Sequence, residues 1–343
     1  MPLLKSNKNS FILLVILLVL CFIGNISLGS VSISFTEIID SFLVKSSDYT
    51  NKEFIVQNYR LPKAFTAILV GSGLGISGLL MQTLFRNPLA GPFVLGISSG
   101  ASLGVAIVIL GAGVFGGWFS MVLISKWSII IAASLGSFLV LLAVMLVSSR
   151  VRDTMAILII GLMFGSITAA IVSVLSYFSS AEQLQQYIFW GFGSLGNLSW
   201  SELLIFASIY FLGLLLSIRS IKALNTLLLG ENYAKSLGLN IKQSRFIIII
   251  ATSLLAGTIT AFAGPIAFIG LAVPHITRQI FNTTNHSILL PAVLLSGAII
   301  MLICDGVAQL PSSDYTLPIN AITSLIGAPV VIWLLVKQRK LNF

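Results

Sequence analysis

Apolar runs of roughly 20 residues recur from one end of the chain to the other, separated mostly by short polar connections. At a rise of about 1.5 Å per residue, a helix of this length crosses about 30 Å of hydrocarbon. Helices satisfy their own backbone hydrogen bonds in lipid, so such runs predict membrane-spanning helices. We predict an all-α polytopic membrane protein with about ten transmembrane helices, near 11–29, 64–84, 92–112, 127–147, 154–178, 203–218, 246–263, 266–281, 288–308 and 318–336.

Composition agrees with this pattern. Of the 343 residues, 57% are hydrophobic and 8% are charged, whereas a soluble domain carries about 25% charged residues. These values exclude a soluble globular protein. We therefore expect a single transmembrane domain over residues 1–343.

Three connections are longer than the others. Residues 30–63 and 179–202 fall on one side of the membrane, and the second contains Trp190 and Trp200, which suit a membrane–water interface. The third connection, 219–245, is the only long one on the opposite side. Its segment TLLLGENYAKSLGLNIKQSR (226–245) is polar between two apolar spans and resembles a small amphipathic helix facing water.

The chain has a net charge of +9, and its basic residues are distributed unevenly between the two sides of the membrane in the predicted topology. With the N-terminus inside, 14 of the 19 basic residues lie on the cytoplasmic side: Lys5, Lys8, Arg86, Arg150, Arg152, Arg219, Lys222, Lys235, Lys242, Arg245, Arg278, Lys337, Arg339 and Lys340. Only Lys45, Lys52, Arg60, Lys63 and Lys126 lie outside. Basic residues mark cytoplasmic loops, so both termini are expected in the cytoplasm and nucleic acid is not expected as a partner.

The cysteines and the first span indicate neither a disulfide nor a cleaved leader. Cys21 and Cys304 both fall inside predicted spans and form no recognisable pair. The first span follows Lys5 and Lys8, as a secretory signal would, but lacks a small-x-small cleavage site. We expect a retained first helix.

Motifs for common catalytic chemistry are absent from the sequence. It has no GxxxxGK[ST], HExxH or GxSxG, and His275 and His286 are expected to have no ligand role. No charged residue falls in the middle of a predicted span, which disfavours an ion-coupled carrier. We expect no catalytic residue, metal site or directly bound cofactor, and an energy source outside the chain.

Three ordered motifs resemble one family. They are YRLPKAFTAILVGSGLGISGLLMQTLFRNPLAGPFVLGISSGASLG (59–104), LGENYAKSLGLN with AGPIAFIGLAVPHITR (229–240 and 263–278), and LPINAITSLIGAPVVIWLLVK (317–337). They are similar to permease subunits of ABC importers for ferric siderophores, haem and cobalamin, and they cover nearly the whole chain after the first span.

The resemblance implies a type II ABC importer permease in the bacterial cytoplasmic (inner) membrane. It would dimerise with an identical chain or a paralogue. Two cytoplasmic ATPase subunits, which hold ATP and Mg, would drive it, and an extracytoplasmic binding protein would deliver the substrate. We expect a ferric siderophore as cargo. Haem or cobalamin is the alternative, and an ion-coupled secondary transporter is the rival of another class.

The resemblance also gives the connection 219–245 a role: in the family this loop forms short coupling helices that dock on the ATPase. The residues fit that role, since Leu229, Ala234, Leu237 and Ile241 have the spacing of one helical face. Glu231 and Lys235 stand four apart in the favourable order. Gly230 permits the turn into the helix and Gly238 can end it.

On the outer side, Arg60 and Lys63 stand three apart before the second span. Family permeases present basic residues there to acidic groups of the binding protein, an attraction that steers docking. Two departures stand nearby: Gln309 replaces a frequent arginine, and 316–320 reads TLPIN.

On the inner side, the family forms cytoplasmic gates from residues that match Asn87, Leu89, Thr154 and Met155. Pro88 breaks the helix there, which suits a hinge.

Two further patterns concern glycine. Gly71, Gly73, Gly75 and Gly78 in the second span are expected to allow close helix packing. GPFVLG (91–96) and GPIAFIG (264–270) suggest an internal repeat, as transporters often have.

Overall fold

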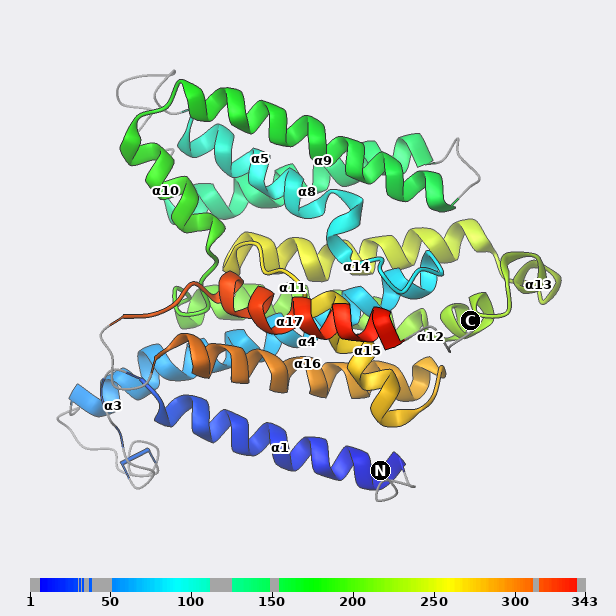
Figure 1. Cartoon of the computed structure of the whole chain (residues 1–343), viewed down its shortest axis with the longest axis horizontal. Helices are drawn as coiled ribbons and strands as arrows, with labels where there is room; N and C mark the ends of the chain where they lie inside the picture. Colours follow the sequence, from blue (N-terminus) through cyan, green and yellow to red (C-terminus); the bar gives the residue numbers. More distant parts are fainter. Residues whose placement is uncertain are drawn as a thin grey trace. The chain divides into compact units, whose positions relative to one another are not determined.

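The computed structural model describes residues 7–29, 31, 33, 37–38, 51–111, 125–148, 154–310 and 315–337. Within these residues the regular elements are helices, as predicted (Figure 1). The α-helices are α1 Asn7–Ser27, α3 Asn51–Ile55, α4 Leu61–Leu84, α5 Ile97–Ile109, α8 Lys126–Ser148, α9 Thr154–Tyr177, α10 Ala181–Gly191, α11 Trp200–Arg219, α12 Ile221–Leu227, α13 Glu231–Ser236, α14 Ile241–Ala263, α15 Ile269–Phe281, α16 His286–Ala308 and α17 Ile319–Lys337. A π-helix, η1 (Val56–Arg60), leads into α4, and a 3₁₀-helix, η2 (Pro92–Leu95), leads into α5.

A helix lies in each predicted span, but the helices differ in length. By length and composition, seven helical stretches of the described chain are long and apolar enough to cross a membrane. Helices α5 and α15 have 13 residues each, about 20 Å at the usual rise. The expectation of full-length helices over 92–112 and 266–281 was therefore wrong, because each of these helices begins only after a Gly-Pro break.

The two Gly-Pro segments have a similar local design. In the first, η2 ends at Gly96, which has the left-handed φ of 75° and directly precedes α5. In the second, Gly264 has φ 78° and Phe268, directly before α15, has φ 65°. Each segment thus lies between a long helix and a short one, and the internal repeat remains a prediction.

The chain folds into two compact units, each assembled from separate stretches. One unit comprises residues 1–79, 194–208 and 267–343, and within it α16 packs against α1, α15 and α17. The other comprises 80–193 and 209–266, and within it α8 packs against α5, α9 and α14.

Glycines bring helix backbones into direct contact inside each unit. A Cβ atom added to Gly71 of α4 would lie 2.2 Å from the carbonyl oxygen of Gly297 in α16. In the other unit, a Cβ atom on Gly100 of α5 would lie 2.4 Å from the carbonyl oxygen of Gly136 in α8. No side chain fits at such distances, so the predicted packing role of Gly71 is confirmed.

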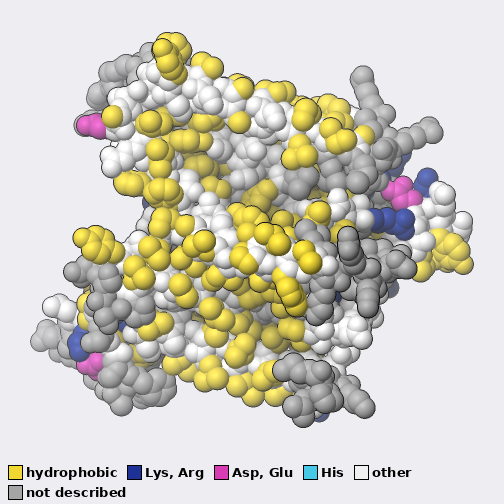
Figure 2. All heavy atoms as spheres, viewed as in Figure 1, with side chains coloured by type: hydrophobic (Ala, Val, Ile, Leu, Met, Phe, Trp, Pro, Cys, Tyr) yellow, Lys and Arg dark blue, Asp and Glu magenta, His cyan; other side chains and the backbone are white. Residues whose placement is uncertain are grey.

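Apolar side chains also cover outward-facing helix surfaces. On α1 and α8 the exposed large apolar residues include Ile12, Ile16, Leu20, Leu135, Phe138 and Leu146. Figure 2 shows hydrophobic side chains spread over the drawn face, with the visible charged side chains gathered near helix ends. Such a surface suits lipid or a neighbouring helix rather than water.

Part of the long connection 179–202 is helical, which the sequence analysis did not predict. Helix α10 begins with a capping box in which the Ser180 hydroxyl accepts from the Gln183 amide and the Gln183 side chain accepts from the Ser180 amide. Farther along, the Trp200 indole donates to the Gln57 carbonyl at 2.9 Å. The S-x-x-Q spacing was the available signal for this helix start.

Candidate functional site

The connection 219–245, called the coupling segment from here on, contains α12 and α13 and ends in the first turn of α14. Gly230, with φ 111°, is the residue before α13, and Gly238, with φ 82°, follows its end. Both positions favour glycine, since other residues rarely adopt these backbone angles. The predicted turn functions of the two glycines are confirmed.

The predicted single apolar face of the coupling segment was wrong. Helix α13 ends at Ser236, and Ile241 already belongs to α14. Ala234 is fully buried, whereas Leu229 and Leu237 are 60% and 61% exposed. The helix break at Gly238 separates Ala234 from Ile241, which the spacing had placed on one helical face. Ala234 therefore anchors the segment, while the two leucines face outward.

Glu231 forms its ion pair with a residue in the next helix. Its carboxylate lies 2.8 Å from the Arg245 guanidinium of α14. The sequence spacing had favoured Lys235, which lies on the same helix, as the partner of Glu231. The pair to Arg245 ties α13 to the first turns of α14, which a local spacing rule could not show.

Residues 86–90, called the gate loop here, form a tight turn after α4. Arg86 has the left-handed φ of 48°, and the Asn87 amide donates to the Gln82 carbonyl at 3.1 Å. The Asn87 side-chain oxygen accepts from the Leu89 amide at 2.9 Å. Asn87 therefore shapes the turn, and the Leu89 side chain stays 43% exposed.

The gate role of all four residues remains a prediction. Thr154 and Met155 begin α9, but their side chains lie outside the described residues. Asn87 and Leu89 thus lie in the turn after α4, and Thr154 and Met155 lie at the start of α9.

The gate loop and the coupling segment are joined by Arg86. Its Nη2 atom donates to the Leu227 carbonyl at 2.9 Å and approaches the Leu228 carbonyl at 3.4 Å. A Cβ atom on Gly230 would lie 3.2 Å from the same nitrogen. The gate loop and the coupling segment, which are far apart along the chain, are therefore in direct contact.

Arg60, the first predicted docking residue, is buried and bonded to backbone. Its guanidinium donates to the carbonyls of Ile26 at 2.7 Å, Ser27 at 3.0 Å and Val31. These carbonyls lie at the end of α1 and just beyond it, where a cation satisfies acceptors left without helical donors. Arg60 therefore holds the end of α1 in this conformation.

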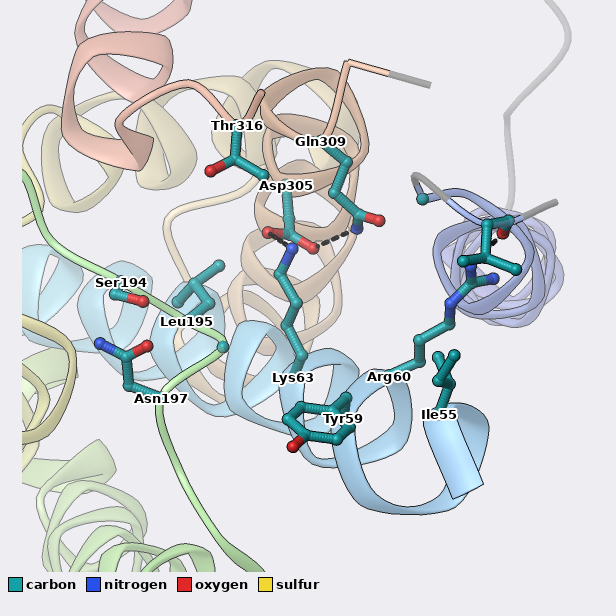
Figure 3. Close-up of a pocket in the computed structure, with 13 residues that line it drawn as sticks. Ile55, Tyr59, Arg60, Lys63, Ser194, Leu195, Asn197, Asp305, Gln309 and Thr316 are labelled. Atoms are coloured by element: carbon teal, nitrogen blue, oxygen red, sulfur yellow. Dashed lines mark hydrogen bonds and ion pairs between the residues drawn. The ribbon is translucent and has the colours of Figure 1, made fainter. Parts of the chain in front are cut away.

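Lys63 is paired with a buried acid. Its ammonium lies 3.1 Å from Asp305 of α16, whose side chain is only 3% exposed (Figure 3). The second carboxylate oxygen of Asp305 accepts from Asn25 at 2.9 Å and from Gln309 at 2.8 Å. Both oxygens of Asp305 thus have partners, as a buried charge requires.

Both predicted docking cations line one cavity of about 460 Å³. Its wall includes Tyr59, Asn197 and Asp305, and Figure 3 shows these side chains around the Lys63 stem. The docking role of Arg60 and Lys63 remains a prediction, although the structure already gives each a partner within the chain.

Sequence reasoning missed Asp305 and Asn25 as functional partners. Both are polar residues near the ends of apolar spans, Asn25 in the first and Asp305 in the ninth. Asp305 and Gln309 also stand four apart, a spacing that places them on one helix face. That spacing was a usable signal, whereas the approach of Lys63 depends on tertiary packing.

Relatives of known class match almost the whole chain. Residues 16–337 match the FecCD transport family. The hemin transport system permease protein HmuU of Yersinia pestis is 36% identical over 329 residues, 95% of each chain. The vitamin B12 import system permease protein BtuC of Salmonella typhi is 37% identical over 289 residues, 84% of this chain and 85% of that one.

Solved structures agree. An inward-facing ABC transporter assigned to the metal-chelate type superposes with a TM-score of 0.82 at 33% identity, covering 96% of this chain and 99% of that one. PsaBC from Streptococcus pneumoniae, at 16% identity and a TM-score of 0.54, shares the fold. The chain therefore belongs to the FecCD transport family and is a permease of the ABC importer class.

Proposed function

We propose that this chain carries a metal already enclosed in an organic chelator across the membrane, and that the cargo is a ferric siderophore. The observation that carries the proposal is the family match, which spans residues 16–337. Two relatives are named for hemin and vitamin B12, and the solved relative at 33% identity is assigned to the metal-chelate type. The shared chemistry is a metal held by an organic ligand.

The character of α9 supports a chelated cargo. Over its 24 residues the helix has no charged side chain, and its exposed residues include Leu162, Ile167 and Ser173. The Ser173 hydroxyl donates to the Ala169 carbonyl of the same helix at 2.9 Å. A smooth apolar wall of this kind suits a bulky chelate, since bare cations require oxygen or nitrogen ligands in place of their water.

The coupling segment supports an ATPase partner on the cytoplasmic side. Around its two short helices, Leu229, Tyr233 and Leu237 are each about 60% exposed. Apolar side chains clustered on a segment rich in charged residues favour a protein contact. We assign this contact to two ATPase subunits that hold ATP and Mg, one for each permease of a homodimer or a heterodimer with a paralogue.

We also propose that the outer cavity around Lys63 receives the binding protein. An acidic side chain of that protein would meet the Lys63 ammonium at the cavity wall and compete with Asp305 for it. Arg60 contributes by fixing the end of α1 beside this surface. This assignment places the cavity outside and both termini in the cytoplasm of a bacterium.

Uptake measurements test the proposed cargo. The permease is expressed with its partner ATPase and binding protein in bacteria that lack their own siderophore, haem and cobalamin permeases. We expect accumulation of radiolabelled ferric siderophore that stops when ATP is depleted. Accumulation of haem or cobalamin instead would overturn the siderophore assignment alone, whereas uptake independent of ATP would contradict the importer mechanism.

A further inference from the structure

The contact between Arg86 and the end of α12 links two candidate sites within one compact unit. We propose that Arg86 is a positioning residue that transmits movement of the coupling segment to the gate loop. The inference rests on the proposed function, because it requires an ATPase that moves the coupling segment. It concerns residues 80–90 and 219–245 of one compact unit.

The Arg86 guanidinium binds main-chain carbonyls at the end of α12 rather than a side chain. Leu227 is the last residue of α12 and Leu228 follows it. The Leu227 carbonyl also accepts from the Gly230 amide at 3.1 Å, so the Arg86 guanidinium shares this acceptor with the turn that leads into α13. A cation at this place is also favoured by the helix dipole. An attachment to main chain moves with the helix itself, whatever the side chains of α12 do.

The other side of the coupling segment is attached as well. Glu231 is bonded to Arg245 of α14 at 2.8 Å, and the Leu239 amide donates to the carbonyl of the buried Ala234 at 3.0 Å. A force on the exposed Leu229 and Leu237 therefore moves a segment held by hydrogen bonds and an ion pair, rather than a flexible loop. Movement of this segment can reach the rest of its unit through α11, which directly precedes α12, through α14 and through Arg86.

Arg86 is built into the same turn as the predicted gate residues. Its left-handed backbone angle sets the direction of the chain into Asn87. Asn87 in turn accepts from Leu89 through its side chain and from the Ala90 amide at 3.0 Å through its carbonyl. A displacement of the Arg86 head group is thus passed to Leu89 through short, bonded steps.

The chemistry explains why arginine suits this position. Its planar head group has five N–H donors and keeps its charge, so it can hold two neighbouring carbonyls at once. A lysine offers a single nitrogen on a flexible stem. Glutamine is two atoms shorter and has no charge, so it loses both the reach and the attraction to the helix end.

The experiment follows gate movement in the complete transporter. The complex of permease, ATPase and binding protein is placed in liposomes, with Cys21→Ala, Cys304→Ala and Leu89→Cys in the permease. The introduced thiol at the exposed position 89 is modified by a water-soluble maleimide, without nucleotide and with trapped ATP. In this parent protein we expect the modification rate to change on ATP trapping.

With Arg86→Gln added, we expect the nucleotide-dependent change to fall about tenfold, within the range of measured couplings, while ATP hydrolysis continues. Arg86→Lys should retain part of the change. Lys8→Gln, which removes an exposed cation from α1, should behave as the parent does. If Arg86→Gln prevents assembly, Arg86→Lys carries the test through its reduced response.

The outcomes separate the two proposals. A parent complex whose gate ignores ATP would contradict the proposed coupling to an ATPase. A parent that responds to ATP, together with an undiminished response in both Arg86 variants, would overturn the inference and leave the coupling intact. A lowered response at unchanged ATP hydrolysis is not expected from a residue that only stabilises the fold.

Discussion

Asp305 shows how a single buried carboxylate organises one end of its unit. It holds Lys63 from α4, Asn25 from α1 and Gln309 from its own helix. Removing one partner of a buried ion pair leaves the other charge uncompensated, which costs more than the pair itself contributes. The stability of this corner therefore depends on the combination rather than on either charge alone.

A double-variant cycle measures that dependence. Asp305→Asn and Lys63→Gln should each destabilise the purified permease in detergent, because each strands a polar partner. The double variant should be more stable than the sum of the two effects predicts, by about 0.5–3 kcal/mol. Thermal unfolding followed by fluorescence provides the measurement, and strictly additive effects would show that the pair is not coupled.

At the scale of single residues, the sequence predicted a residue's role correctly where that role depends only on its own backbone conformation. The functions of Gly230 and Gly238 follow from their backbone angles, which residue type alone suggests. The partners of Glu231 and Lys63 do not, because Arg245 and Asp305 reach them from other helices. Spacing rules describe neighbours on one helix, and these contacts are tertiary.

At the scale of elements, glycine determines which helices can touch along their backbones. Gly71 of α4 faces Gly297 of α16 so closely that neither position has room for a methyl group. Gly24 of α1 is a matched contrast, since a Cβ atom there would meet nothing within 4 Å. Lipid supplies no hydrophobic force between helices, so such close packing is a main source of their association.

Alanine substitution at these two glycines separates packing from helix propensity. We expect Gly71→Ala to destabilise the fold by about 1–3 kcal/mol, since the added methyl must push two backbones apart. Gly24→Ala should be neutral or stabilising by up to about 1 kcal/mol, because alanine favours the helix. Chemical unfolding in detergent compares the two, and equal effects would contradict the packing argument.

The apolar pattern located every helix of the predicted ten, yet it misjudged two of their lengths. Hydropathy continues through 92–96 and 266–268, where the backbone leaves the helix. The break there is due to Gly-Pro and to left-handed residues, which an average over about 20 residues hides. Helix α10 was missed for a related reason, because its amphipathic sequence lies in a connection between spans.

At the scale of the whole molecule, the distribution of basic residues implies an orientation. The coupling segment contains Arg219, Lys222, Lys235, Lys242 and Arg245, whereas α10 has the acidic Glu182 and no basic residue. Cytoplasmic loops are enriched in lysine and arginine. We therefore expect the coupling segment inside and α10 outside.

Cysteine labelling tests this orientation. In a background of Cys21→Ala and Cys304→Ala, the exposed positions of Glu182→Cys and Lys222→Cys supply one thiol each. A membrane-impermeant maleimide should modify Glu182→Cys in cells whose cytoplasmic membrane is intact and accessible to the reagent. It should modify Lys222→Cys only after that membrane is opened. The reverse pattern would invert the assignment of both the ATPase and the binding-protein surfaces.

The interruptions before α5 and α15 have a consequence for helix phase. A continuous helix turns by about 100° per residue and so dictates which side chains face a neighbour many turns later. Gly96 and Phe268 have left-handed backbone angles, so the rotational phase of the preceding helix is not continued beyond them. Each short helix starts with an azimuth of its own, so its contact face can evolve independently of the long helix that precedes it.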